Sequence, residues 1–175
     1  MKRILVIDQA TIKTAYNIIE IDCGKPKWIC CSVIKIKTTD NVIHRINELY
    51  NKLSEIIDEY NIDTLVLEEV PVSRKTNLNV SIVLLKLLGA MELLACRKNI
   101  NVEIMNVALW KNTSGIKSRT RNEQKKESIQ LALKRFPAYK SIIADSDDCS
   151  DALNMGYAFL KNKKIIWQNI KKMIR

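Results

Sequence analysis

The chain has 175 residues, of which 47% are hydrophobic, and 29 Lys and Arg residues outnumber 19 Asp and Glu residues for a net charge of +10. This length suits one domain, which buries roughly 70% of its unfolded surface and needs no disulfide or structural metal for stability. Five cysteines without a C-x-x-C pair and a single histidine, His44, argue against a zinc site and indicate a reduced, cytoplasmic protein.

Hydrophobic patterns in the first sixty residues predict three strands and a helix. "RILVID", residues 3–8, is an apolar strand that ends at an aspartate, which also argues against a secretory signal. Residues 14–22 and 28–37 form the next two strands, and a Gly-Lys-Pro sequence between them signals a turn. Apolar residues recur at helical spacing over residues 41–60.

The remaining chain alternates strands and helices. "DTLVLEEV", residues 63–70, is a fourth strand ended by a proline, and residues 78–98 form a long apolar helix. Residues 101–107 are a fifth strand, followed by a polar basic loop and a helix near 122–136. A last helix lies within residues 145–160.

This order predicts an α/β fold in which a three-strand antiparallel meander leads into parallel crossovers, with helices on both sides. Residues 1–175 form a single domain, with a basic helix at about 162–175 suggested by isoleucines at i+4 spacing. We expect no membrane span, because Lys86 and Glu92 interrupt the richest apolar window.

The last helix contains an unusual pair of acids. Its apolar stripe includes Ala152, Met155 and Phe159, and Asp148 and Asp151 lie on the same stripe. Two inward-facing carboxylates are unexpected in a strongly basic chain. A functional site would explain them if the first and fourth strands are parallel neighbours, because the carboxyl ends of such strands adjoin and form sites in α/β proteins.

The acids at those strand ends are Asp8 and Glu68, so we expect them to meet Asp148 and Asp151 in one cleft. Two carboxylates about 4 Å apart repel by on the order of 4 kcal/mol at an effective dielectric near 20, so a cation is needed between them. Oxygen ligands without His or Cys select Mg²⁺ or Mn²⁺. Two ions in such a site would activate water and stabilise the leaving oxygen of a phosphodiester.

Each acid also has an ordinary interpretation. Asp147 and Asp148 favour the helix dipole, and Asp8 could cap a turn. Glu69 alternates to the other face of its strand and is expected to be structural. The hypothesis therefore depends on the conjunction of two strand-end acids with two inward helical acids.

The excess of positive charge is concentrated in blocks. Residues 111–126 hold six cations and one anion, and residues 161–175 hold six cations and no anion. Such blocks usually contact a polyanion, although they can serve solubility alone. We predict nucleic-acid contacts for the following residues: Arg74, Lys75, Lys111, Lys117, Arg119, Arg121, Lys125 and Lys126.

Three segments, "ILVIDQATIKTAYNII", "LVLEEV" and "DDCSDALNMGYAFL", resemble the acidic blocks of RuvC-type Holliday-junction resolvases in the ribonuclease-H-like superfamily. The resemblance covers nearly the whole chain, and D-x-x-D-A-L is its most specific part. It implies that four metal-binding acids match Asp8, Glu68, Asp148 and Asp151. It also implies catalytic lysines at Lys111 and Lys126, with Lys125 as a competing choice for the second.

The activity implied by the resemblance is a structure-selective, metal-dependent endonuclease that resolves four-way and other branched DNA junctions by paired cuts. Family members usually have Pro-Gly after the first aspartate, where this chain has Gln9-Ala10, and often an aromatic wedge after the second block, where Pro71 stands. These departures concern substrate selectivity more than catalysis. The Lys-, Ile- and Asn-rich composition is compatible with a phage protein in an infected bacterial host.

Other classes remain as alternatives. A ribonuclease-H-like nuclease acting on RNA–DNA hybrid or unbranched nucleic acid could use the same acids. A sugar-kinase or actin-like ATPase would need a glycine after Asp8, which "DQATIK" lacks. It would also need two lobes. A non-catalytic binding module would have little reason to retain four inward acids.

The resemblance also implies a homodimer, as does the pair of equivalent strands in a four-way junction. The candidate interface is the helix from about Leu78 to Cys96, which is apolar on more sides than one sheet can cover. Gly89 and Ala90 could allow close helix approach, although a helix of this kind can also be buried within its own monomer.

Overall fold

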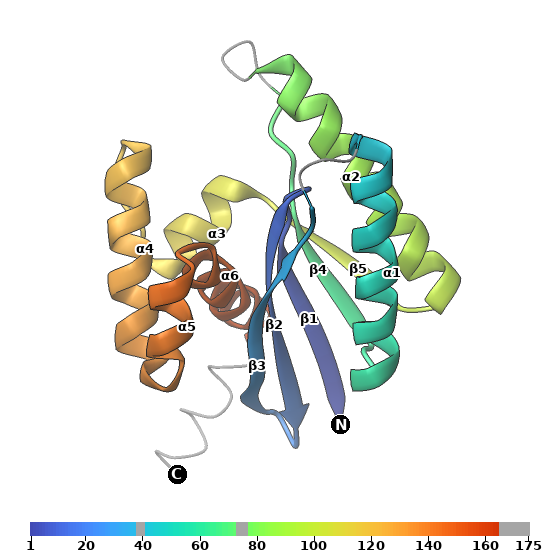
Figure 1. The fold of residues 1–175 in the computed structure, drawn as a ribbon. Helices are drawn as coiled ribbons and strands as arrows, with labels where there is room; N and C mark the ends of the chain where they lie inside the picture. The colour runs from blue at the N-terminus through green and yellow to red at the C-terminus, as the bar shows by residue number, and fades with distance from the viewer. Residues whose placement is uncertain (38–40, 73–76, 165–175) are drawn as a thin grey trace.

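The computed structural model describes residues 1–37, 41–72 and 77–164 (Figure 1). The elements, in chain order, are β1 (Lys2–Asp8), β2 (Lys13–Asp22), β3 (Lys25–Lys35), α1 (Val42–Tyr60), β4 (Thr64–Glu68), α2 (Leu78–Lys98), β5 (Asn101–Met105), α3 (Val107–Ser114), α4 (Arg121–Arg135), a 3₁₀ turn (Pro137–Tyr139), α5 (Lys140–Asp145) and α6 (Asp148–Asn162). The predicted basic helix at 162–175 lies almost wholly outside the described residues, and α6 ends where it was expected to begin.

The five strands form one mixed sheet in the order β3-β2-β1-β4-β5. Strands β1, β2 and β3 pair antiparallel, whereas β1 with β4 and β4 with β5 are parallel. This confirms the predicted meander followed by crossovers. It also confirms that the first and fourth strands are parallel neighbours.

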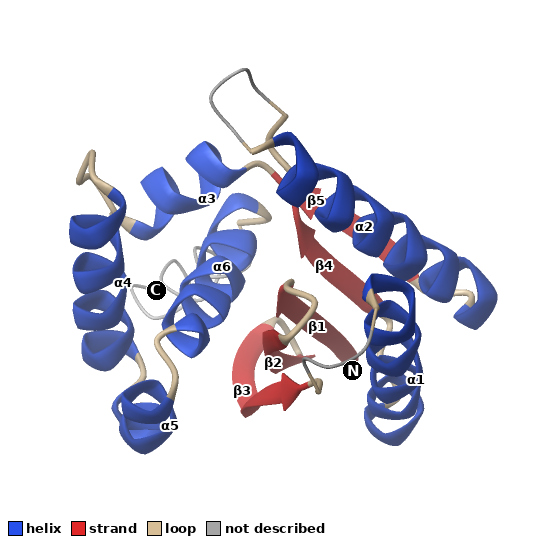
Figure 2. Cartoon of the chain, turned by 45° about the horizontal axis from the view of Figure 1, so that its top comes forward, coloured by secondary structure: helices blue, strands red, loops and turns tan. Residues whose placement is uncertain are grey.

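The sheet separates two layers of helices, with α1 and α2 on one face and α3 to α6 on the other (Figures 1 and 2). Alternation along β1 sends Leu5 and Ile7 into the cluster beneath α1 and α2, and sends Ile4 and Val6 into the cluster beneath α6. The next residue of the second series is Asp8. Its carboxylate therefore points to the α6 side of the sheet.

Helix α6 lies unusually close to β2, and two residues explain why. A Cβ placed on Gly156 would come within 2.9 Å of Ile19 Cδ1 and 3.0 Å of Asn17 Oδ1, so only glycine fits there without a shift. The fully buried Asn17 donates from Nδ2 to the carbonyl of Ala152 at 2.7 Å. These contacts fix the depth of α6 on the sheet and hence the position of its acids.

The structure differs from the predicted elements between β5 and α6. The expected polar loop begins with helix α3, because Asn106 caps its start through a bond from Leu109 N at 3.1 Å and Gly115 ends it at a φ of 93°. Eight residues are too few to show a clear period. Asp147 occupies the N-cap position of α6, where its side chain makes no capping bond within the described chain and binds Lys125 instead.

Candidate active site

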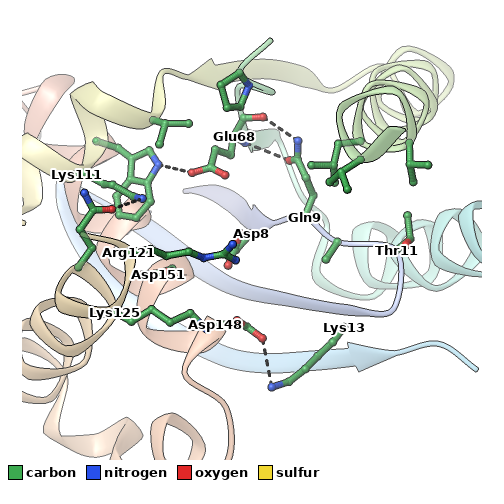
Figure 3. A pocket seen from close by; sticks show the side chains of 18 of the residues that line it. Asp8, Gln9, Thr11, Lys13, Glu68, Lys111, Arg121, Lys125, Asp148 and Asp151 are labelled. Atoms are coloured by element: carbon green, nitrogen blue, oxygen red, sulfur yellow. Dashed lines mark hydrogen bonds and ion pairs between the residues drawn. The ribbon is translucent and has the colours of Figure 1, made fainter. Parts of the chain in front are cut away.

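The carboxyl ends of β1 and β4 place two acids side by side. The parallel register pairs Ile7 with Leu67, so Asp8 and Glu68 follow on the next rung and on the same face. Glu68 is held by its side chain, because Trp110 Nε1 donates to Glu68 Oε1 at 2.7 Å (Figure 3). The predicted juxtaposition of these strand ends is therefore present.

The first turn of α6 brings the other two acids to the same pocket. Asp148 and Asp151 lie three residues apart, which puts them on one side of the helix. Asp151 accepts a hydrogen bond from Ser128 Oγ at 2.5 Å, and Asp148 pairs with Lys13 Nζ at 3.2 Å. Figure 3 shows Asp148 and Asp151 on the opposite side of the pocket from Glu68.

The four acids open onto a cavity of about 1020 Å³. Its remaining lining includes a basic wall and an apolar wall. The basic wall comprises Lys13, Lys111, Arg119, Arg121 and Lys125. The apolar wall includes Ile12, Pro71, Val80, Val83 and Leu84.

The electrostatics of the acids reflect their crowding. Burial raises the pKa of Asp8 well above its ordinary value, and repulsion from Glu68, Asp151 and Asp148 raises it further. Burial also raises the pKa of Glu68 and of Asp151, although the bonds from Trp110 and Ser128 act in the opposite direction. The nearby Lys111 lowers the pKa of all three groups without restoring ordinary values.

The structure brings one of the two predicted catalytic lysines directly to the cavity. Lys111 Nζ lies 5.5 Å from the centre of the Trp110 ring and donates to Gln124 Oε1 at 3.1 Å. Lys126 is exposed and does not line the cavity, whereas Lys125 does and lies 3.9 Å from Asp148. One residue along a helix turns the side chain by about 100°, so the geometry favours Lys125.

The predicted nucleic-acid contacts divide into three groups. Arg119 and Arg121 are exposed and line the cavity, while Lys117 is exposed just outside it. The loop that carries Lys117 is anchored to α4, because Glu127 accepts bonds from the backbone of Lys117 and Ser118 at 2.9 and 3.0 Å. Arg74 and Lys75 lie outside the described residues.

Sequence reasoning noted Gln9 only as a departure from the family pattern, yet it positions Glu68. Its Nε2 donates to the carbonyl of Glu68 at 2.8 Å, and its Oε1 accepts from Glu68 N at 3.1 Å. The side-chain amide thus extends the pairing of β1 with β4 by one rung. A glutamine after a strand gives no pattern from which this bond could have been predicted.

A buried polar network behind Asp151 was also missed. Ser128 accepts from Asn154 Nδ2 at 3.0 Å, and Asn154 Oδ1 accepts from Arg135 Nη1 at 2.7 Å. Ser128 and Asn154 are almost completely buried. The network ties α4 to α6 and fixes the orientation of the Asp151 carboxylate.

The residues fit a divalent cation by their chemistry, since four carboxylates from three elements provide only hard oxygen donors. As the side chains stand, the described residues contain no group of three or more His, Cys, Asp or Glu close enough to hold an ion. Lys13 and Lys125 take part of the charge of Asp148 in this arrangement. A cation would replace these lysines as the counter-charge.

Comparisons with known sequences identify one family. A family model described as crossover junction endodeoxyribonuclease RuvC matches residues 4–158. The RuvC of Prosthecochloris aestuarii is 30% identical over 71 residues, or 41% of this chain and 38% of that protein. The RuvC of Chlorobium phaeobacteroides is 26% identical over 152 residues, or 87% of this chain and 78% of that protein. The aligned part thus spans about two fifths of the first relative and most of the second.

Solved structures share the fold at low sequence identity. Thermus thermophilus RuvC in complex with a Holliday junction substrate matches with a TM-score of 0.70 and 14% identity, covering 93% of this chain and 97% of that one. The fowlpox virus resolvase bound to Holliday junction DNA matches with a TM-score of 0.64 and 18% identity, covering 91% and 97%. These likenesses confirm the predicted fold class.

Proposed function

Because the chain belongs to the RuvC family of crossover junction endodeoxyribonucleases, we propose that it is a divalent-metal-dependent endonuclease that resolves four-way DNA junctions. The observation that carries the proposal is the shared cavity of Asp8, Glu68, Asp148 and Asp151, faced by a wall of lysines and arginines. Acids suited to Mg²⁺ or Mn²⁺ and cations suited to phosphate thus meet in one place. We propose two ions per site.

Divalent ions bound there would supply an activated water and stabilise the leaving oxygen of the phosphodiester. The chain itself supplies the remaining functions. The four carboxylates hold the ions, and Lys111 lies where its charge can offset the developing charge of the phosphate. Arg119, Arg121 and Lys125 hold the DNA strand at the rim against the repulsion of the acids.

Cleavage of defined synthetic DNAs tests the proposal. Four-way, Y-shaped and linear duplexes and an RNA–DNA hybrid are incubated with Mg²⁺ or Mn²⁺ and the products are mapped. Paired nicks at the four-way branch support a junction resolvase. Preferential degradation of the hybrid would instead establish the ribonuclease-H-like alternative. Equal cleavage of all the duplexes would show that the enzyme does not select branched DNA.

The loop before α4 is expected to contribute to DNA affinity. Substituting Lys117, Arg119 and Arg121 together with alanine should weaken junction binding and flatten its salt dependence, since log affinity falls with log salt by about 0.9 per neutralised phosphate. Fluorescence anisotropy at several salt concentrations measures the slope. Lys111→Ala, by contrast, should lower cleavage more than binding.

A matched control removes the same charge elsewhere. Lys2, Lys25 and Lys27 are exposed around the β2–β3 turn, at the end of the sheet opposite Asp8. Replacing these three with alanine should leave the slope nearly unchanged. If both triple variants flatten the slope equally, the loop is not the DNA surface and only net charge matters.

We further propose that the working unit is a homodimer formed through α2. The inner face of this helix is buried at Leu87, Met91 and Leu94, but its outer face is not covered by the described chain. Side chains spaced three or four residues apart form an apolar outer stripe, in which Leu78, Ile82, Leu85 and Leu93 are 63%, 41%, 43% and 51% exposed. By length and composition alone, α2 is also long and apolar enough to span a membrane. Those two properties are weak evidence for a span, because a core helix with a buried inner face shares them.

The outer stripe of α2 is complementary to itself. Gly89 lies at its middle, and a Cβ there would meet no described atom within 4 Å, so a second helix can approach closely. In an antiparallel pair of α2 helices crossing at Gly89, residues equally far before and after it face each other. Leu85 would then face Leu93 of the partner, and Lys86, three residues before, would face Glu92, three residues after.

A further inference from the structure

Trp110 has two contacts that matter for the acidic cavity. It lies on α3 with only 2% of its surface exposed, and it belongs to the apolar cluster beneath α6. The N–H of a buried indole usually needs a hydrogen-bond partner, because burial removes it from water. Here that partner is an acid of the cavity: the indole N–H donates to Glu68 Oε1 at 2.7 Å, and the ring face lies 5.5 Å from the ammonium of Lys111.

These contacts leave Glu68 with little freedom. Gln9 holds the backbone of Glu68 from both its N–H and its carbonyl, at 3.1 and 2.8 Å. Trp110 holds one carboxylate oxygen, which leaves the second oxygen of Glu68 for another ligand. A buried indole cannot follow a moving carboxylate, because close packing fixes the ring.

The same ring orients the cation. Lys111 directly follows Trp110 on α3, and its ammonium is placed between the ring and Gln124 Oε1, 3.1 Å away. A cation over the face of an indole is attracted electrostatically by the electron-rich ring. The edge of one aromatic side chain therefore holds an acid, and its face holds a lysine.

We propose that Trp110 is a positioning residue that presents Glu68 to a divalent cation and Lys111 to the phosphate. The proposal rests on the proposed function, because that function assigns a metal ion to Glu68 and a phosphate to Lys111. Residues behind metal ligands typically contribute 10–100-fold to metal affinity. Loss of the indole N–H should therefore raise the Mg²⁺ concentration for half-maximal cleavage by about 10–100-fold.

Trp110→Phe is the direct test, because it removes the N–H while keeping an aromatic ring near Lys111. We expect a higher Mg²⁺ requirement, a smaller loss of rate at saturating Mg²⁺ and unchanged junction binding without metal. A readout independent of activity is the rise in Tm on adding Mg²⁺ or Mn²⁺ to the DNA-free protein. That rise should need correspondingly more metal in the variant.

The chain offers a matched control in Trp28. Its indole packs on Phe136 with ring centres 4.8 Å apart, and its Nε1 has no hydrogen-bond partner among the described residues. Trp28→Phe therefore makes the same chemical change without breaking such a bond. Both variants can lose stability, but only Trp110→Phe should change the metal requirement.

A second variant covers the case in which Trp110→Phe fails to fold. The chain has three tryptophans, so Trp28 and Trp167 can be changed to phenylalanine and the remaining Trp110 replaced by 3-benzothienylalanine. This analogue keeps the size of the indole and has sulfur in place of the N–H. A metal requirement equal to that of the same background with tryptophan would overturn the proposal. Failure of the wild type to cut any junction would instead overturn the proposed function.

Discussion

Asp8→Asn and Asp151→Asn will each abolish junction cleavage while leaving junction binding intact or tighter. Each change removes one charged oxygen ligand and leaves the basic wall of the cavity untouched. Metal ions contribute several kcal/mol to transition-state stabilisation, and about 4 kcal/mol corresponds to a thousandfold in rate. Glu68→Gln and Asp148→Asn should behave in the same way. Single-turnover cleavage beside a gel-shift titration measures both properties.

Asp8→Asn should also stabilise the metal-free protein at neutral pH. The pKa of Asp8 is raised by burial and by its acidic neighbours, so the folded state binds this proton more tightly than the unfolded state. That contribution to stability is present at low pH and is lost as the pH rises through the raised pKa. Removing the charge should therefore raise Tm at pH 7, by about 2–4 °C per 1 kcal/mol, and change it little in acid.

An exposed aspartate provides the control for both effects. Asp22 lies at the far end of β2 from the cavity, outside the group of four acids, so Asp22→Asn should change neither cleavage nor the Tm at pH 7. Full cleavage by Asp151→Asn would contradict the assignment of the helical acids. A lower Tm for Asp8→Asn at neutral pH would show that the carboxylate stabilises the fold instead of straining it.

Gly89→Glu will convert the proposed homodimer into a monomer without unfolding the chain. Glutamate favours a helix by up to about 1 kcal/mol relative to glycine, and a Cβ at this position meets no described atom within 4 Å. At the proposed crossing, however, two such side chains would collide and bury unpaired charge at a cost of about 3–5 kcal/mol. Dimer affinity should fall at least about a hundredfold, since 1.4 kcal/mol is tenfold. Analytical ultracentrifugation at micromolar concentration measures the change.

The charges that flank Gly89 test the antiparallel geometry separately. Lys86→Glu alone and Glu92→Lys alone should each weaken the dimer, because each places like charges opposite one another. Combining the two substitutions should restore the pair of opposite charges and hence the dimer. Restoration supports the crossing at Gly89, and a double variant weaker than either single one would rule it out. A wild type that sediments as a monomer, both free and on a junction, would exclude the dimer altogether.

Most of the fold could be predicted because its signals are local. The strand that ends at Asp8 and the apolar helix at 78–98 appear in the structure close to their predicted bounds. The inward direction of Asp148 and Asp151 followed from helical spacing alone. Helix α3 was missed, because eight residues with one buried tryptophan carry too little periodicity.

The hydrogen bonds that hold the acids of the site in place could not be predicted from local patterns. The bonds of Gln9 and Trp110 to Glu68 join residues 59 and 42 positions apart, and nothing in their local sequence favours those partners. The choice between Lys125 and Lys126 depends on the rotation of α4 about its axis. The sequence therefore predicts most of the charged groups that line the cavity, although not Lys13, and none of the neutral groups that orient them.

Because of the close contact at Gly156, the two sides of the sheet should differ in their tolerance to substitution. Helix α6 carries two of the four acids and rests directly on β2, so a change of volume beneath it shifts the acids with the helix. The layer formed by Leu49, Leu53 and Met91 across the sheet carries none of them. An engineer seeking a more heat-resistant variant should therefore repack the layer of Leu49, Leu53 and Met91, and leave unaltered both the α6 side and the start of α2, which lines the cavity.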